Sequence, residues 1–323
     1  MTTATRLREL EFVDLYLGHN YADVKGVPGS NAARTPVPDC LHDDLGTVRA
    51  KCAELSAAND EPEFALPHDG VLYRVTVMQD LYSKPIYFLR RMTAQVRDFT
   101  QLGLPASLTN YLMATATRGL ILFAGDMASG KTTSAASLLA TRLRAHGGLA
   151  LAIEDPPETQ LDGTHGEGRC IQIPALRKHG HYREQLRRAM RTGVSTLLIG
   201  EIRCKDTAVE AIKQSINGLT VISTIHASSA VDAVTRINSL AGTDDISNPH
   251  EVLAGGLAGI VHQQINRVER PGLPTNVRLA FKALTLDGKD ADGIRTKIRR
   301  ATYEQLAQDV ENQSRLNIWN HDK

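Results

Sequence analysis

From about residue 106 onward, short apolar runs alternate with longer segments whose apolar residues recur at helical spacing. Each run is bounded by glycine or polar residues, which is typical of a buried strand. Because strands and helices alternate, we expect an α/β fold with a mostly parallel sheet covered on both faces. The predicted strands are 119–124, 148–153, 195–200 and 219–225, and the predicted helices around them are 106–117, 132–145, 182–191 and 206–216.

The last hundred residues show the same two kinds of pattern less regularly. We predict helices from residue 228 onward and over 248–260, a strand over 278–284 and a charged terminal helix over 292–313. The sequence shows no internal repeat and no low-complexity tract. We assign these residues to the same domain as the alternating strands and helices.

The first hundred residues follow a different pattern. Residues 5–17 have helical periodicity in their first half and strand-like alternation later. Residues 26–44 are rich in Gly, Pro, Asn and Asp and are predicted to be a loop. A short helix over 45–58 and two neighbouring strands over 70–78 and 84–92 complete a small α+β domain.

A break in the pattern separates these two regions. Leu102-Gly-Leu-Pro105 combines glycine and proline between two stretches of regular pattern, which favours a hinge. We therefore expect an N-terminal domain over residues 1–100, a hinge linker over 101–107, and a second domain over 108–323 that ends in a helical extension.

Composition narrows the class of protein only broadly. Of 323 residues, 42% are hydrophobic and 23% are charged, and the formal net charge is +1, which indicates a globular protein without global attraction to nucleic acid or membrane. The sequence shows neither a membrane-length apolar run nor the apolar core of a signal peptide. The four cysteines are widely spaced, which favours reduced thiols in a cytoplasmic protein over a disulfide framework or zinc site.

The first chemical motif lies between the predicted strand 119–124 and the helix 132–145. Gly125-Asp-Met-Ala-Ser-Gly-Lys-Thr132 matches the phosphate-loop pattern, and its flanks favour this interpretation over a simple glycine-rich turn. The glycines allow backbone N–H groups to surround phosphate oxygens. Lys131 is expected to reach the β- and γ-phosphates, and the Thr132 hydroxyl to bind Mg²⁺. The predicted nucleotide-binding residues are Gly125, Ala128, Ser129, Gly130, Lys131, Thr132 and Thr133.

Three further strand ends carry polar residues. In an open parallel sheet, ligands bind beyond the carboxyl ends of the strands. Glu154, Asp155 and Glu158 follow the second predicted strand, Glu201 the third and His226 the fourth. Each residue alone could be a helix cap, a solvated loop residue or a structural histidine. Their coincidence with a phosphate loop predicts a nucleotide site.

The strand that ends at Glu201 resembles a Walker B strand, although Gly200 replaces the usual Asp. Metal coordination by this strand would then fall on Glu201, through a water molecule, in addition to the Thr132 hydroxyl. Nucleotide hydrolysis also needs a carboxylate that orients and deprotonates water. Glu158 is the second candidate carboxylate.

Four motifs, in order, carry a family resemblance: Gly-Asp-Met-Ala-Ser-Gly-Lys-Thr, Ile-Glu-Asp-Pro-Pro-Glu, Leu-Ile-Gly-Glu-Ile-Arg and Ser-Thr-Ile-His-Ala. Over most of residues 70–270 the chain resembles the ATPases of the type II/type IV secretion and type IV pilus superfamily, in which these motifs are named Walker A, Asp box, Walker B and His box. The resemblance implies a RecA-like P-loop NTPase core, a PAS-like N-terminal domain, and ATP and Mg²⁺ as cofactors.

The resemblance also implies an assembly. Members form a homo-hexameric ring whose domains move during ATP turnover, which drives pilus extension, pilus retraction, secretion or conjugation-type transport. We therefore expect a protein at the cytoplasmic face of the inner membrane. It would be held there through an inner-membrane platform protein, without direct contact to nucleic acid.

Roles follow from the resemblance residue by residue. Glu158 matches the family's catalytic carboxylate, Glu201 its Walker B glutamate, and His226 the histidine that senses the γ-phosphate. Arg74 and Arg90 resemble the arginines that reach the nucleotide when the domains close. The alternative for this pair is two solvated surface arginines.

The chain departs from the family pattern at several positions. Cys204 stands where the family commonly has Asp, Ala227 where it has Thr, and Gly193-Val194-Ser195 where it has Pro-Asp. Neither the tetracysteine zinc module nor the C-terminal signature of retraction ATPases is evident. These differences indicate a divergent member, such as one from a conjugation or accessory pilus system.

Two other functions remain open on the sequence alone. Helicases and DNA translocases share the core fold, and the basic helix over 183–191 could contact DNA or line a subunit interface. The net charge of +1 favours the protein motor. The third hypothesis is a scaffold that binds ATP without turnover, and the presence of Lys131, Glu158 and Glu201 weighs against it.

Overall fold

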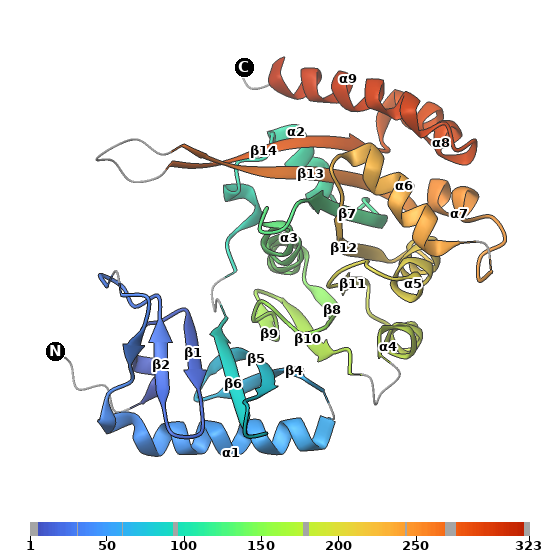
Figure 1. Ribbon diagram of the computed structural model, residues 1–323. Helices are drawn as coiled ribbons and strands as arrows, with labels where there is room; N and C mark the ends of the chain where they lie inside the picture. Colours follow the sequence, from blue (N-terminus) through green and yellow to red (C-terminus); the bar gives the residue numbers. More distant parts are fainter. Residues whose placement is uncertain are drawn as a thin grey trace. The chain divides into compact units, whose positions relative to one another are not determined.

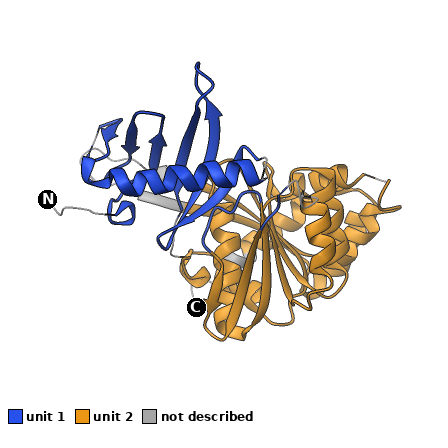
Figure 2. Ribbon diagram, turned by 90° about the horizontal axis from the view of Figure 1, so that it is seen from below, with its two compact units in different colours: residues 1–95, 155–160, 174–181 blue, residues 96–154, 161–173, 182–323 orange. Residues whose placement is uncertain are grey.

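The computed structural model describes residues 6–30, 32–59, 61–92, 96–176, 181–242, 244–268 and 276–319 (Figure 1). The chain forms two compact units, each with its own sheet and hydrophobic core (Figure 2). Unit 1 comprises residues 1–95, 155–160 and 174–181, and unit 2 comprises residues 96–154, 161–173 and 182–323. Within the described ranges, no helix combines the length and the apolar character needed to cross a bilayer.

Unit 1 is built on a six-stranded antiparallel sheet with strand order β3-β2-β1-β6-β5-β4. The helix α1 packs against it, and Val48 and Cys52 of that helix join the core of the unit. The elements are η1 (Leu7–Glu9), β1 (Asp14–Leu17), β2 (Ala22–Lys25), β3 (Thr35–Pro36), η2 (Asp39–Leu41), α1 (His42–Asn59), β4 (Glu63–His68), β5 (Val71–Gln79) and β6 (Pro85–Arg91).

The predicted strands over 70–78 and 84–92 are β5 and β6, and their predicted pairing is confirmed as antiparallel. Strand β4 has no counterpart in the predicted pattern because it contains Pro67, and proline in a strand is confined to edges. The structure places β4 at the edge of the sheet, where proline is tolerated.

Unit 2 contains an eight-stranded sheet with the order β14-β13-β7-β12-β11-β8-β10-β9. The five neighbours from β13 to β8 run parallel, which confirms the predicted α/β fold with a mostly parallel sheet. The elements are η3 (Phe99–Gln101), α2 (Ala106–Met113), β7 (Gly119–Gly125), α3 (Lys131–His146), β8 (Gly148–Glu154), β9 (Gly163–His165), β10 (Gly168–Pro174), α4 (His181–Ala189), β11 (Thr196–Ile199), α5 (Lys205–Ser215), β12 (Thr220–His226), α6 (Ala230–Ala241), α7 (Pro249–Gly256), β13 (Leu257–Val268), β14 (Asn276–Thr285), η5 (Gly288–Asp290), α8 (Ala291–Arg299), η6 (Tyr303–Gln305) and α9 (Leu306–Trp319).

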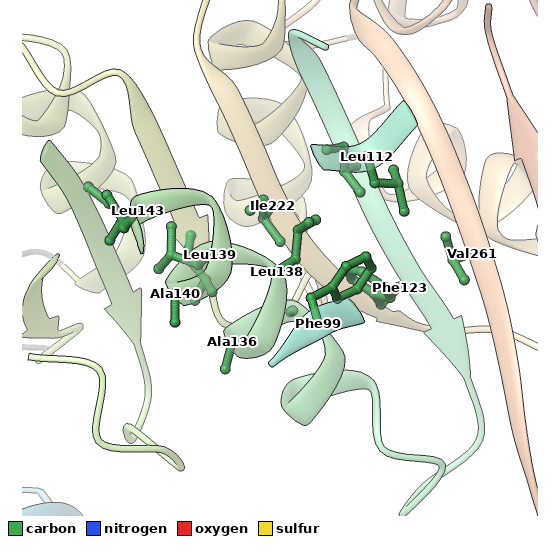
Figure 3. Close-up of a cluster of buried hydrophobic side chains, with 14 of the residues drawn as sticks. Phe99, Leu112, Phe123, Ala136, Leu138, Leu139, Ala140, Leu143, Ile222 and Val261 are labelled. Atoms are coloured by element: carbon green, nitrogen blue, oxygen red, sulfur yellow. The ribbon is translucent and has the colours of Figure 1, made fainter. Parts of the chain in front are cut away.

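Strand β7 and helix α3 lie at the centre of unit 2. All seven residues of β7 are buried, and both α3 and α5 pack against it. Leu139 of α3 belongs to the same core cluster as Ile222 of β12, and Phe99 meets Phe123 of β7 edge-on with ring centroids 6.2 Å apart (Figure 3). Burying a side chain of this size contributes roughly 1.5–3 kcal/mol. The packing therefore holds both ends of the loop between β7 and α3.

The predicted helix over 248–260 is wrong over its last four residues, 257–260. Helix α7 ends at Gly256, and the chain from Leu257 onward forms β13, which pairs with β7 and β14. Periodicity alone cannot distinguish a short apolar run in a buried strand from one in a buried helix. This segment is a strand because it pairs with β7, which lies far from it in the sequence.

The single charged helix predicted over 292–313 is also wrong, because the structure has two helices, α8 and α9, in this region. Between them, Ala301 has a left-handed φ of 54°, which a continuing α-helix does not allow. The hairpin partners β9 and β10 have no counterpart among the predicted elements. Strand β9 contains three residues, too few to produce a recognisable pattern.

The four cysteines divide evenly between buried and exposed positions. Cys52 lies in the core of unit 1 and Cys170 in the core of unit 2. Burial raises the pKa of each of these thiols to about 12. Cys40 in unit 1 and Cys204 in unit 2 are exposed.

Candidate nucleotide site

The loop over residues 125–131 joins the end of β7 to the start of α3 in unit 2. Gly125 has a φ of 150° and Gly130, the residue that caps α3, has a φ of 86°. Both values lie where glycine is favoured because it lacks a Cβ atom. Ala128 also has a left-handed φ, of 59°, which is costly for a residue with a side chain and is often found at functional sites. The loop therefore has the backbone that its sequence motif predicts.

Lys131 lies inside this loop and is 6% exposed. Its Nζ atom donates hydrogen bonds to the backbone oxygens of Gly125, at 2.9 Å, and of Asp126, at 2.6 Å. Thr132 follows it in a half-buried position, and Thr133 is exposed. The loop's own carbonyl groups thus hold the ammonium group within the curve of the loop, from which it can approach a phosphate.

Glu201 and His226 come together at the carboxyl edge of the same sheet. Glu201 follows β11, and His226 is the last residue of β12, the strand between β11 and β7. The Nε2 atom of His226 lies 3.3 Å from Oε1 of Glu201, and His226 is the register partner of Gly125 across β12 and β7. A carboxylate, an imidazole and the phosphate loop therefore lie at three neighbouring strand ends, where open parallel sheets bind their ligands.

Close packing around Gly200 favours glycine at this position. A Cβ atom at this position would lie 3.1 Å from Cγ of Glu154 and 3.1 Å from the hydroxyl of Tyr182. Glu154 is 3% exposed and accepts a hydrogen bond from Gln172 Nε2 at 2.7 Å. A side chain at position 200 would therefore crowd these neighbours, which agrees with glycine in place of the usual Asp.

The remaining predicted site residues lie in unit 1. Arg74 donates from Nη1 to Oε1 of Glu158 at 3.0 Å and from Nη2 to Oε2 of Glu63 at 3.2 Å. Arg90, the register partner of Arg74, donates to both carboxylate oxygens of Asp14, at 2.7 and 3.2 Å. Arg74 and Arg90 line a pocket of about 310 Å³ on the sheet of unit 1. The structure thus brings Glu158 and Arg74 together as an ion pair.

Asp14 favours the charged form of Arg90, and both arginines remain accessible. The hydrogen bonds and charge of Asp14 raise the pKa of Arg90 above its usual value, and its side chain is 65% exposed. Arg74 is 34% exposed. Neither arginine is buried, so each can exchange its present carboxylate partner for another anion at modest cost.

A metal ion at this site would depend on the nucleotide. Across the described ranges, no three or more His, Cys, Asp or Glu side chains are grouped as metal ligands. In phosphate-loop proteins, Mg²⁺ takes phosphate oxygens, water and a Ser/Thr hydroxyl. Thr132 offers that hydroxyl, with Glu201 as a carboxylate for a water ligand.

One residue of the site is absent from the sequence-based set. Gln263 of β13 is completely buried and contacts the phosphate loop through the backbone oxygen of Ser129. A single glutamine after an apolar run is not part of a recognised sequence motif, so it could not be selected from the sequence. The prediction of a helix over 248–260 also hid that this segment lies beside β7.

The fold of unit 2 and the loop between β7 and α3 are those of a P-loop nucleotide-binding protein. A family model described as "Type II/IV secretion system protein" matches residues 64–315, and the chain belongs to that family. This confirms the resemblance inferred from the four motifs.

Individual relatives are similar over part of their length. The type IV pilus ATPase PilU of Pseudomonas aeruginosa is 27% identical over 226 residues, which cover 68% of this chain and 57% of PilU. The competence protein ComGA of Streptococcus pneumoniae is 34% identical over 149 residues, 46% of this chain and 43% of ComGA. The chain thus spans about half the length of these curated relatives.

Solved structures confirm the fold. The ATPase DotB of Legionella pneumophila superposes with a TM-score of 0.72 at 16% identity, covering 93% of this chain and 85% of DotB. The pilus retraction motor PilT, solved with bound ADP, superposes with a TM-score of 0.71 at 22% identity, covering 93% of this chain and 86% of PilT. The RecA-like core expected from the motifs is therefore the observed architecture.

Proposed function

We propose that this protein is a motor subunit that hydrolyses ATP to drive type IV pilus dynamics or type II or type IV secretion. The observation that carries the proposal is the convergence of the phosphate loop, Glu201 and His226 at three neighbouring strand ends of unit 2. Membership of the secretion family supports the same conclusion. The curated relatives named above are a type IV pilus ATPase and a competence protein, which agrees with an export or pilus role.

In this proposal the phosphate loop and Lys131 bind the β- and γ-phosphates, and α3 adds the partial charge of its N-terminus. Mg²⁺, held by the Thr132 hydroxyl and by water on Glu201, would neutralise the phosphate oxygens. His226 donates to the γ-phosphate from its place beside Glu201. Its 3.3 Å contact with Glu201 gives a direct route by which loss of the γ-phosphate alters the position of that carboxylate.

Glu158 serves in this proposal as the general base that orients and deprotonates the attacking water. Its carboxylate is bound to Arg74, whose second amino group is bound to Glu63. An incoming phosphate must therefore compete with two carboxylates for this guanidinium group. We propose that turnover includes exchange of Arg74 from carboxylate to phosphate, which frees Glu158 to act on water.

The assembly is also part of the proposal. We propose a homo-hexamer in which the domains 1–100 and 108–323 move about the linker 101–107. The ring would act at the cytoplasmic face of the inner membrane, docked on a platform protein of the pilus or secretion system.

We favour a protein motor over a nucleic-acid translocase. The arginines of the basic helix α4 are engaged by acids of their own unit: Arg183 pairs with Asp206 and Asp245, Arg187 with Glu210, and Arg188 with Glu184. These acids lower the net positive charge of the surface around α4, and a less positive surface attracts a phosphate backbone less strongly. DNA-stimulated turnover with steep salt dependence would overturn the preference for a protein motor.

The direct test is hydrolysis of Mg-ATP by the purified protein and by two variants. Lys131→Ala should abolish turnover and weaken ADP binding at least tenfold, because the loop loses its ammonium group. Lys289→Ala is the control, since this exposed lysine lies in η5 and should leave both properties unchanged. Equal turnover in the wild type and the Lys131→Ala variant would refute the site.

A further inference from the structure

We infer that Gln263, in β13, is a positioning residue that holds the phosphate loop in the shape that binds nucleotide. The inference rests on the proposed nucleotide site and adds to it a residue on a neighbouring strand. Gln263 is completely buried, and it lies 134 positions along the chain from the loop residue that it contacts. Its role would therefore come from the tertiary fold rather than from a sequence motif.

The central contact is a hydrogen bond from the side-chain amide of Gln263 to the loop backbone. Nε2 donates to the carbonyl oxygen of Ser129 at 2.6 Å. In a planar trans peptide, the carbonyl of one residue and the N–H of the next point in opposite directions. By holding the Ser129 carbonyl toward β13, the amide turns the N–H of Gly130 away from β13. That N–H is one of the groups that a phosphate loop uses to bind its anion.

Gln263 also accounts for both glycines of the motif. A Cβ atom at Gly125 would lie 2.3 Å from the backbone oxygen of Gln263, and a Cβ atom at Gly130 would lie 3.1 Å from its Nε2 atom. The backbone oxygen of Gln263 therefore lies close to the first glycine of the loop, and its side-chain amide lies close to the second. A Cβ atom at Gly125 would therefore force a shift of the backbone, and one at Gly130 would crowd the side-chain amide.

The buried polar atoms at this contact lower the stability of the folded protein. Oε1 of Gln263 and Oγ of Ser129 are buried, and neither forms a hydrogen bond within the described parts of the chain. An apolar side chain at position 263 would avoid the desolvation of the amide oxygen. The amide is therefore better explained by what it does to the loop than by stability.

Gln264 offers a matched control. It follows Gln263 on β13, and successive side chains of a strand point to opposite faces. Gln264 is exposed. The same substitution at 263 and 264 therefore removes the same chemical group from the same strand, with and without contact to the phosphate loop.

The test measures three quantities on the full chain and on the variants Gln263→Met, Gln263→Glu and Gln264→Met. These are ADP affinity by calorimetry, melting temperature without nucleotide, and amide hydrogen exchange of the peptide 125–133 without nucleotide. Methionine keeps the length of the side chain and removes the donor. Glutamate keeps the shape and, when ionised, places an acceptor against the Ser129 carbonyl.

We expect Gln263→Met to weaken ADP binding about tenfold, equivalent to about 1.4 kcal/mol, and Gln263→Glu to weaken it further. Both variants should exchange the amides of 125–133 faster than the wild type at a temperature well below melting. Gln264→Met should match the wild type in all three measurements. In steady-state turnover, Gln263→Met should raise KM more than it lowers kcat, because the loop is less often in its binding shape.

Two results would overturn the inference. One is ADP affinity and loop exchange in Gln263→Met equal to the wild type, even if the melting temperature falls, since that indicates a purely structural role. The other is an equal loss in Gln264→Met. A wild type that does not bind ADP would instead refute the proposed function. Loop exchange still tests the positioning role in that case, because it is measured without nucleotide.

Discussion

The two groups of candidate site residues are held in different ways. In unit 2, the phosphate loop is defined by its backbone, and Lys131 is 6% exposed within it. In unit 1, Arg74 and Arg90 are held by side-chain ion pairs, and their side chains are 34% and 65% exposed. A site whose shape is set by its backbone, with packed side chains beneath it, can bind a ligand without rearrangement of the chain. A set of exposed ion pairs can exchange partners, so we propose that the first region binds the nucleotide and that the second acts as a switch.

The largest expected effect comes from Glu158. Glu158→Gln should leave ATP binding intact and reduce kcat about 1,000-fold, because a positioned general base contributes 100- to 10,000-fold. Single-turnover hydrolysis and nucleotide binding would be measured together. Glu63→Gln is the matched control, since Glu63 and Glu158 both accept a hydrogen bond from Arg74. Equal effects of the two variants would mean that Glu158 acts only as an ion-pair partner.

The second effect concerns Glu201 in unit 2. Glu201→Gln should reduce kcat by about 100-fold or more, because a charged group that orders the metal-bound water is lost. ADP affinity should change little, since the loop contacts remain. Titration of Mg²⁺ in the turnover assay provides the check, because the variant should need more Mg²⁺ for half-maximal rate. An unchanged Mg²⁺ requirement would contradict the metal role of Glu201.

The third effect tests switching in unit 1. Arg74→Ala should reduce hydrolysis about 100-fold in the assembled ring, as expected for loss of one group that stabilises transition-state charge. Arg8→Ala, which removes another exposed arginine of unit 1 paired with an acid, should have no effect. Turnover would be compared in hexamer and monomer fractions. A loss of equal size in the monomer would contradict a role that depends on domain closure.

The smallest effect is on stability. Burial lowers the pKa of His262 in β13, although the charge of Asp126 opposes this shift. The unfolded state therefore binds a proton more readily than the folded state, and His262 reduces stability as pH falls below about 6.5. His262→Gln should lose this part of the pH dependence, a change of a few degrees in melting temperature between pH 8 and 5. His19→Gln in unit 1, where the histidine is exposed, should retain it.

The parts of the site that the sequence could predict are those set by short-range rules. The phosphate loop is a local motif, so Gly125 to Thr132 could be placed between a strand and a helix. The proximity of Glu201 and His226 followed from the rule that parallel strands end at one edge, and the 3.3 Å contact agrees with it. The catalytic and binding roles of these residues stay predictions until they are measured.

The parts that the sequence could not predict depend on contacts between distant segments. Arg74 and Glu158 are 84 positions apart, and nothing in either segment specifies the other as a partner. Gln263 reaches the loop because β13 pairs with β7, and an apolar run with glycines is equally compatible with a helix. Helix α8 ends at Arg299, and the chain turns at Ala301, which has a left-handed φ. These features are decided by packing rather than by local pattern.

The distribution of thiols makes the proposed motion measurable without engineering. The two buried cysteines are shielded and scarcely ionised at neutral pH, because their pKa is raised to about 12. Cys40 and Cys204 are exposed, one on each unit. Maleimide dyes would therefore attach at one native position on either side of the linker. Energy transfer between donor and acceptor would report, in single molecules, whether the two units move during each cycle of ATP turnover.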